Sequence, residues 1–271
     1  MRVTLVPNLR RPGVGRLPEP DGRRASLPEH GRLCPVLEDA NRTGYLVFPP
    51  LEAREAFQVR YLEENLYQAT MLRDPGGGRP PTVVFAAEIR PAAGAPGAEV
   101  RDIRHVDRAS GLDEAGALEL LDALTTNLNA PPGGIGIRGA FDFVTTEGWD
   151  TLYLGVVNET ARPQIPVLTA RIETDWYPQN TEFRYAMQPG DVLMVNGGAP
   201  IGQVFFVPRE AISLAPASEA DVALFLERQE RYWAERAEKE RTTPYGALIA
   251  HHYRDLQRLN RNPDASDSGQ P

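Results

Sequence analysis

Hydrophobic and polar positions follow one pattern in the middle of this 271-residue chain and another at its end. From residue 135 to residue 214, short β-branched or aromatic runs recur about every eight to twelve positions and are separated by turn residues. This spacing is typical of an all-β fold. It predicts strands at 135–137, 141–145, 151–157, 167–172, 181–185, 192–195 and 201–207.

The first half of the chain carries fewer regular runs. The apolar runs predict strands at 44–48 and 57–62, and either a buried strand or the end of a helix at 82–86. Leucines recur at helical spacing between 112 and 128, with Ser110 as a candidate N-cap. The opening residues mix Arg, Pro and Gly, which predicts an extended arm or a first strand followed by coil.

The end of the chain is predicted to be helical. Ser218 is a candidate N-cap, and Val222, Phe225 and Trp233 form an apolar stripe at helical spacing. A break at residues 243–244 precedes a second helical run. These patterns therefore place two helices after the strand-rich region.

The patterns divide the chain into four parts. These are an extended arm at 1–33, a β-rich core at 34–215, C-terminal helices at 216–260 and a disordered tail at 261–271. Because no linker separates the strand-rich stretch from its flanks, we expect one compact unit. The expected fold is mainly β with a C-terminal helical appendage, α+β overall.

Composition limits the possible functions. The formal net charge of −8 argues against a nucleic-acid-binding protein, because such proteins usually need a basic surface. Lys239 is the only lysine, so the chain has no lysine-based phosphate loop. Cys34 is the only cysteine, which excludes an intrachain disulfide. The start of the chain has no apolar run typical of a signal peptide or membrane span, so we expect a cytoplasmic protein without a membrane partner.

The most specific motif is ARIETDWY at residues 170–177, followed by Gly190-Asp191 and by GAPIGQVF at 198–205. From Phe141 to Pro208 this pattern resembles the β-clip fold of the dUTPase and dCTP deaminase superfamily. The resemblance implies a β-clip-like or related distorted β-barrel core. It also implies a homo-oligomer, a trimer in dUTPases.

The resemblance also implies roles for individual residues. Glu173 falls where dUTPases place the aspartate that activates water, and Trp176 falls where they place the tyrosine that stacks on the base. The chain departs from the pattern at 146–149, which lacks the Arg-Ser pair that holds phosphate. Glu147 would repel a triphosphate there, so dUTPase activity itself is not expected.

The whole chain also resembles a bacterial protein family of about this length. The matching residues are Cys34-Pro35, Gly44-Tyr45, 145–149, 173–175 and 198–209. This resemblance implies a single architecture and supplies no reaction.

The acidic turn provides the candidate catalytic and substrate-binding residues. Glu173 and Asp175 are the candidate catalytic carboxylates, one of them acting as a general base. The candidate substrate-binding residues are Trp176, Tyr177, Trp149 and Arg209. The alternative is structural: the aromatic side chains fill a trimer interface, and the acids pair with arginines such as Arg171 or Arg184. For Arg209, the alternative is a structural ion pair.

Two weaker patterns suggest iron or haem, although the sequence requires no cofactor. His105 and Asp107 have the spacing of two ligands in a non-haem iron site, and Cys34 could bind a haem iron as a thiolate. The alternatives are a solvated strand edge or turn for the first pair, and a small buried hydrophobic residue at a turn before a strand for Cys34.

Three functions remain open at this point. The first is a small-molecule-binding protein, an enzyme with a carboxylate and aromatic pocket. The second is a non-catalytic homo-oligomeric ligand-binding or assembly protein. The third is an oxidative enzyme dependent on iron or haem.

Overall fold

The structure, a computed structural model, describes residues 1–22, 27, 31–32, 34–62, 66–91, 98–106, 111–126, 133–159, 165–244, 246 and 248–261. For residues 91 and 98–106 it describes the backbone only. The Ser110 cap and Asp107 lie outside the described residues. So does the predicted tail, apart from Arg261, which still belongs to a helix.

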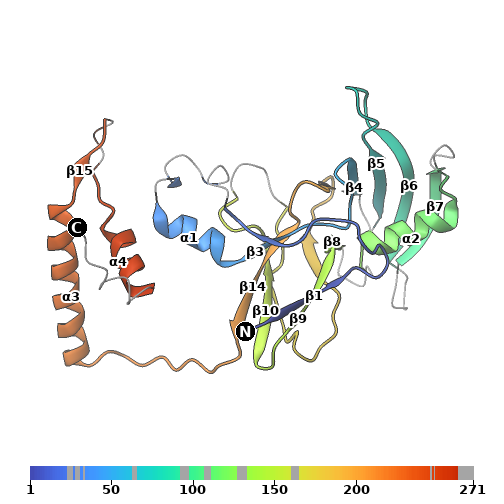
Figure 1. The fold of residues 1–271 in the computed structure, drawn as a ribbon. Helices are drawn as coiled ribbons and strands as arrows, with labels where there is room; N and C mark the ends of the chain where they lie inside the picture. Colours follow the sequence, from blue (N-terminus) through green and yellow to red (C-terminus); the bar gives the residue numbers. More distant parts are fainter. Residues whose placement is uncertain are drawn as a thin grey trace. The chain divides into compact units, whose positions relative to one another are not determined.

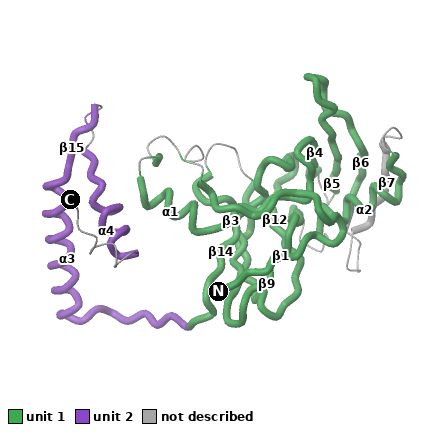
Figure 2. Tube along the Cα trace, in the orientation of Figure 1, with its two compact units in different colours: residues 1–210 green, residues 211–271 purple. Residues whose placement is uncertain are grey.

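The chain forms two compact units, Met1–Glu210 and Ala211–Pro271 (Figure 2). The expectation of one compact unit is therefore wrong. Residues 211–218, at the start of the second unit, form neither helix nor strand, and their side chains are exposed. This segment acts as a linker that the hydrophobic pattern did not reveal, because it lacks the Gly- and Ser-rich composition of a flexible linker.

The first unit is built mostly of strands (Figure 1). Its strands are β1 (Val3–Pro7), β2 (Glu19–Pro20), β3 (Tyr45–Val47), β4 (Glu55–Tyr61), β5 (Tyr67–Arg73), β6 (Thr82–Pro91), β7 (Ala98–Val106), β8 (Gly134–Arg138), β9 (Phe141–Thr145), β10 (Trp149–Leu154), β11 (Ala170–Ile172), β12 (Glu182–Ala186), β13 (Val192–Asn196) and β14 (Gly202–Pro208). Its helices are α1 (Pro35–Thr43) and α2 (Glu114–Leu124).

Two five-stranded antiparallel sheets dominate this unit. One has the strand order β13-β4-β5-β6-β7 and the other β11-β10-β14-β3-β2. Two further antiparallel pairs are β1-β9 and β12-β8. The prediction of a mainly β fold with C-terminal helices is confirmed, and each strand predicted between 135 and 207 is present.

Aromatic side chains from several strands meet in the core of the first unit. Phe143, Tyr153 and Phe183 are all buried. The ring centroid of Tyr153 lies 6.3 Å from that of Phe143 and 5.7 Å from that of Phe183. Gly202 packs directly on this cluster. A Cβ atom at position 202 would lie 2.1 Å from Phe183, so only glycine fits there without a shift of the ring.

The N-terminal segment is held to the core by a buried ion pair. Arg11 donates to both carboxylate oxygens of Glu55, at 2.7 and 2.9 Å, and Arg73 adds a third hydrogen bond of 3.1 Å. The Glu55 side chain is fully buried. Strand β1 also pairs with β9 in register Leu5 to Phe143. The predicted arm is therefore paired with β9 through strand β1 and attached to the core through the ion pair of Arg11 with Glu55.

The helices of the first unit differ from the sequence-based expectation. The pattern predicted only a turn at Cys34-Pro35, but Pro35 occupies the first position of α1, where its missing N–H costs nothing. Helix α2 has Asp113 as its N-cap, which accepts a hydrogen bond of 2.8 Å from the Gly116 amide. Residues 82–86, for which the sequence allowed either a buried strand or the end of a helix, belong to strand β6.

The second unit contains helix α3 (Glu219–Glu238), the short strands β15 (Arg241–Thr242) and β16 (Leu248–Ile249), and helix α4 (His252–Arg261). The Ser218 cap is confirmed: its side chain accepts from the Asp221 amide at 3.2 Å, and Asp221 accepts from the Ser218 amide at 2.9 Å. No helix among the described residues combines the length and the apolar composition needed to cross a membrane.

Candidate functional site

The acidic turn lies at one end of the β10-β14 strand pair. Trp149, the first residue of β10, lies opposite Pro208, the last residue of β14, and Arg209 follows directly. The turn at 173–176 follows β11, which pairs with the other side of β10. The antiparallel register therefore brings this turn next to Arg209.

The Arg209 guanidinium is the centre of a charge cluster at this end. Its Nε donates to Asp150 Oδ1 at 2.8 Å and its Nη2 donates to Asp175 Oδ1 at 2.6 Å. Its Nη1 lies 3.4 Å from Glu173 Oε2. The hydrogen bonds with Asp175 and Asp150 raise the pKa of Arg209 above its ordinary value. Most of the guanidinium is thus already engaged by the protein, which leaves little of it to hold a substrate.

Both carboxylate oxygens of Asp175 accept hydrogen bonds. Its second carboxylate oxygen accepts a hydrogen bond of 2.9 Å from the Gly148 amide, and its side chain is only 6% exposed. The hydrogen bond from Arg209 is the main reason that the pKa of Asp175 lies below its ordinary value. A carboxylate with a lowered pKa is a weak proton acceptor, so this environment favours an ion-pairing role.

Asp150 belongs to the same cluster and is buried. Arg171 Nε donates to its Oδ2 at 2.6 Å, opposite the contact with Arg209. Burial by itself raises the pKa of Asp150, but the hydrogen bonds from Arg209 and Arg171 outweigh burial and lower it. The sequence did not single out Asp150 as the shared partner, because its two arginines come from distant positions.

Three threonine hydroxyls fix the turn to the sheet. Thr174 Oγ1 lies 2.9 Å from Thr145 Oγ1 and 2.7 Å from Thr151 Oγ1, and all three residues are buried. Thr145 also donates to the Trp149 carbonyl at 2.6 Å. Thr174 is therefore the anchor of the turn, and Glu173 and Asp175 lie on either side of it in sequence.

Glu173, Trp176 and Tyr177 are accessible. Trp176 Nε1 donates to Glu173 Oε2 at 2.5 Å, and the Glu173 side chain is 46% exposed. Trp176 and Tyr177 are 65% and 46% exposed, with ring centroids 5.7 Å apart. Of the three carboxylates around Arg209, Glu173 is the one that a ligand could reach and to which it could give a proton.

A cavity of about 490 Å³ lies at the opposite end of the β10-β14 pair. Gly155, directly after β10, and Ile201, directly before β14, both line it. The lining combines apolar residues with polar groups, among them the side chains of Glu159, Tyr185 and Asn196, and consists of Gly155, Val156, Glu159, Ile165, Val167, Tyr185, Val192, Leu193, Met194, Asn196, Gly198, Ala199, Pro200 and Ile201. None of the site residues predicted from the sequence is among them.

The sequence of strand β13 has a pattern that could have indicated this cavity. It is an edge strand, and its buried residues Leu193 and Val195 alternate with Val192 and Met194, which are 41% and 48% exposed and are apolar as well. A strand with one wet face usually alternates apolar and polar residues. Apolar residues on both faces indicate that the outer face also has a partner or a ligand.

A buried polar network holds one wall of the cavity. Gln203 is fully buried, accepts from the Val157 amide at 3.0 Å and donates to the Asn41 carbonyl at 2.8 Å. Asn158, in a left-handed conformation with φ 57°, donates to Asn41 Oδ1 at 2.8 Å. Gln203, in the GAPIGQVF motif, thus joins the loop after β10 to helix α1.

The candidate metal ligands are placed separately. Cys34 is the half-buried N-cap residue of α1, with its amide donating to the Gly31 carbonyl at 3.0 Å. His105 lies in β7 opposite Ala86, and Asp107 is outside the described residues. Within the described ranges, no group of three or more His, Cys, Asp or Glu side chains is positioned to hold a metal ion.

Comparison with known proteins adds one structural similarity. No family model matches the chain, and no curated protein matches it. Among solved structures, a mutant dUTPase from phage phi11 of S. aureus aligns with a TM-score of 0.36 and 10% identity, over 81% of this chain and 98% of that chain. Superposition at this level supports no inference about ligand or reaction, so the function must be argued from the geometry of the chain itself.

Proposed function

We propose that the first unit is a small-molecule-binding domain whose ligand occupies the cavity between β13 and the Gly155 and Ile201 end of the β10-β14 pair. The observation that carries this proposal is the cavity itself. Its volume of about 490 Å³ and its combination of apolar side chains with a few polar groups match the pockets that hold small organic ligands.

The lining also indicates the chemical class of the ligand. Val167, Val192 and Met194 offer apolar surface, and Asn196 and Glu159 are the polar side chains at its margin. Tyr185 donates its hydroxyl proton to the Ile201 carbonyl at 2.5 Å, so its oxygen can still accept a hydrogen bond. A compact apolar molecule with one or two hydrogen-bonding groups fits this surface.

The proposal can be tested with anilinonaphthalene sulfonate, a fluorescent probe that binds apolar cavities. We expect saturable binding by the full chain. Met194→Trp should weaken binding by about tenfold because the indole fills the cavity, whereas Val144→Trp, an exposed position on β9 away from it, should not. Absence of saturable binding, or equal binding by both variants, would contradict the proposal.

A catalytic role for Glu173 requires a substrate at the turn rather than in the cavity. The two sites lie at opposite ends of one strand pair, so a compact ligand in the cavity does not reach Glu173. In that proposal Glu173 accepts the proton and Trp176 supplies an aromatic surface. Glu173→Gln should then abolish turnover without changing stability.

One observation favours a second candidate, self-association through the turn. Trp176 and Tyr177 form an exposed aromatic pair at the edge of a sheet, and aromatic residues are enriched at the centres of protein interfaces. Light scattering coupled to size exclusion tests it. Trp176→Ala combined with Tyr177→Ala should lower the mass of the particle, and Tyr253→Ala should not. A monomeric wild-type protein rules this candidate out.

A further inference from the structure

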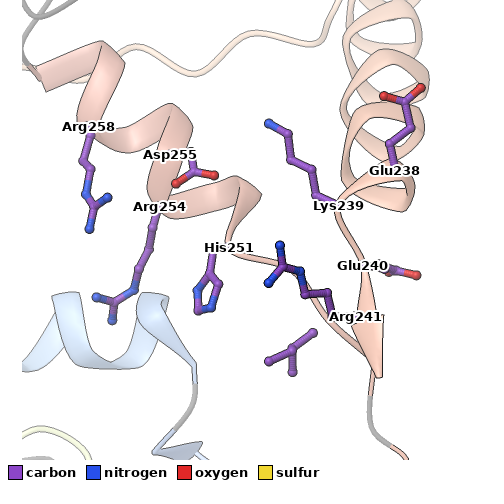
Figure 3. Close-up of a pocket in the computed structure, with 9 residues that line it drawn as sticks. Glu238, Lys239, Glu240, Arg241, His251, Arg254, Asp255 and Arg258 are labelled. Carbon is purple, nitrogen blue, oxygen red and sulfur yellow. The ribbon is translucent and has the colours of Figure 1, made fainter. Parts of the chain in front are cut away.

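The second unit has a charged cavity of its own, of about 780 Å³ (Figure 3). It lies between the end of α3, strand β15 and helix α4. The lining residues are Glu238, Lys239, Glu240, Arg241, Ile249, His251, Arg254, Asp255 and Arg258. Four of these carry a permanent positive charge, in a chain whose overall charge is negative.

Three of these cations have no carboxylate partner among the residues that the structure describes. They are Lys239, Arg241 and Arg258. Glu240, one of the three acids of the lining, is instead bound by Arg236, at 2.8 Å. Its side chain points away from Arg241 in Figure 3. The cavity therefore keeps an excess of positive charge.

Lys239, the only lysine of the chain, contacts a buried histidine through its ammonium group. Its Nζ lies 3.0 Å from Nδ1 of His252, which is fully buried, and His252 Nε2 lies 3.3 Å from Glu235 Oε2. An ammonium can only donate, so Nδ1 accepts and the imidazole proton is on Nε2, beside Glu235. Two of the three ammonium protons of Lys239 remain for another acceptor.

Helix α4 adds to this electrostatic environment. His251 directly precedes the helix, Arg254 lies on its first turn and Arg258 lies in its last turn, so the cavity extends along α4 from its N-terminal end. The helix dipole and the free amide groups of that end favour negative charge. The guanidinium forks of Arg241 and Arg258 match the spacing of phosphate oxygens.

We propose that this cavity binds a small molecule carrying phosphate groups, recognised by Lys239, Arg241 and Arg258. Phosphate is preferred to a carboxylate because three separate donor groups face one cavity, and a phosphate offers more acceptor oxygens at higher charge. The cavity is larger than a single phosphate ion, so the ligand has at least two phosphates or an organic group attached.

Isothermal titration calorimetry of the full chain with pyrophosphate, in physiological salt, tests this proposal. We expect saturable binding, weaker binding of orthophosphate, and weaker binding of citrate, which has a similar charge without phosphorus. Arg241→Ala combined with Arg258→Ala should weaken pyrophosphate binding at least about tenfold, since two charge-assisted contacts are lost.

The matched control is Arg228→Ala combined with Arg231→Ala. These arginines are exposed on α3, outside the lining, and their loss changes the net charge equally. The control should bind pyrophosphate like the wild type. The single variant Arg258→Gln should give an intermediate affinity, and circular dichroism should show unchanged helix content in all variants. Absence of pyrophosphate binding, equal affinity for citrate, or equal weakening by the control would overturn the proposal.

Discussion

Arg209 Nη2 lies 2.6 Å from Asp175 Oδ1, across 34 positions of sequence. The same guanidinium donates through Nε to the buried Asp150. The turn that resembles a catalytic motif in sequence is therefore also a junction that ties the chain after β14 to β10 and to the loop after β11. Any function of this turn has to operate with Asp175 and the neighbouring Asp150 of β10 already paired.

Removing the buried carboxylate of this junction should destabilise the first unit. Asp150→Asn leaves Arg209 and Arg171 without their shared partner, and loss of such charged hydrogen bonds costs about 1–3 kcal/mol. Urea denaturation measures the change. Glu147→Gln, an exposed position nearby, should be neutral. Equal stability of the two variants would show that the junction contributes nothing.

The junction should also make stability depend on acid pH. The pKa values of Asp150 and Asp175 are lower in the folded chain than in the unfolded chain, where an aspartate titrates near about 3.9. Between these values the unfolded state binds more protons, so the free energy of unfolding falls as the pH decreases below about 4. The stabilisation is complete above that pH.

The measurement is urea denaturation at a series of pH values from neutral to strongly acidic. Arg209→Met should flatten the acidic part of the profile, because Asp175 then loses the main cause of its lowered pKa. Residual slope is expected from Glu55, whose pKa is lowered by Arg11 and Arg73 despite the opposing effect of burial. An unchanged slope in Arg209→Met would contradict the assignment.

The ion pairs of Glu55 with Arg11 and Arg73 should contribute more to the free energy of unfolding than the contacts of Arg209 with Asp150 and Asp175. The Glu55 side chain is fully buried and pairs with the largely buried Arg11 and with the exposed Arg73, and loss of one partner of a buried ion pair typically costs about 3–5 kcal/mol. Glu55→Gln should lower the free energy of unfolding by this amount. The exposed Glu52→Gln is the matched control, and a similar small effect of both changes would argue against a structural role for Arg11.

Gly202 should be intolerant of even one additional methyl group. Its Cβ would lie 2.1 Å from Phe183 and 2.8 Å from the Leu154 carbonyl, and overpacking of a core typically costs about 1–3 kcal/mol. Thermal denaturation of Gly202→Ala should show a lower midpoint. Gly22→Ala, where nothing lies within 4 Å of the added atom, should melt like the wild type.

Local features of the fold could be predicted because their causes are local. The strands at 141–145 and 192–195 follow from β-branched and aromatic runs between turn residues. The start of α3 follows from the reciprocal cap of Ser218 and Asp221. Helix α1 was missed because Cys34-Pro35 matches both a turn and a helix start, and the hydrogen bond from Gln203 to the Asn41 carbonyl joins residues 162 positions apart in sequence.

The candidate site could be predicted only as a set of residues. The sequence grouped Glu173, Asp175 and Trp176 because they are neighbours in one turn, and it offered Arg209 as either an anion grip or an ion-pair partner. It could not identify Asp150 as the shared carboxylate, because that depends on the pairing of β10 with both β11 and β14. The cavity was missed for the same reason, since its walls come from distant segments.

By itself, the sequence determined the mainly β character, the strands between 135 and 207 and the helical end, since these depend on contacts between close neighbours. Tertiary structure alone decided which arginine meets which acid, and that the cavity lies at the other end of the strand pair from the acidic turn. The physical reason is the register of antiparallel strands. Because Trp149 pairs with Pro208 and Leu154 pairs with Gln203, Arg209 and the acidic turn lie at one end of the β10-β14 pair. The cavity lined by Gly155 and Ile201 lies at the other end.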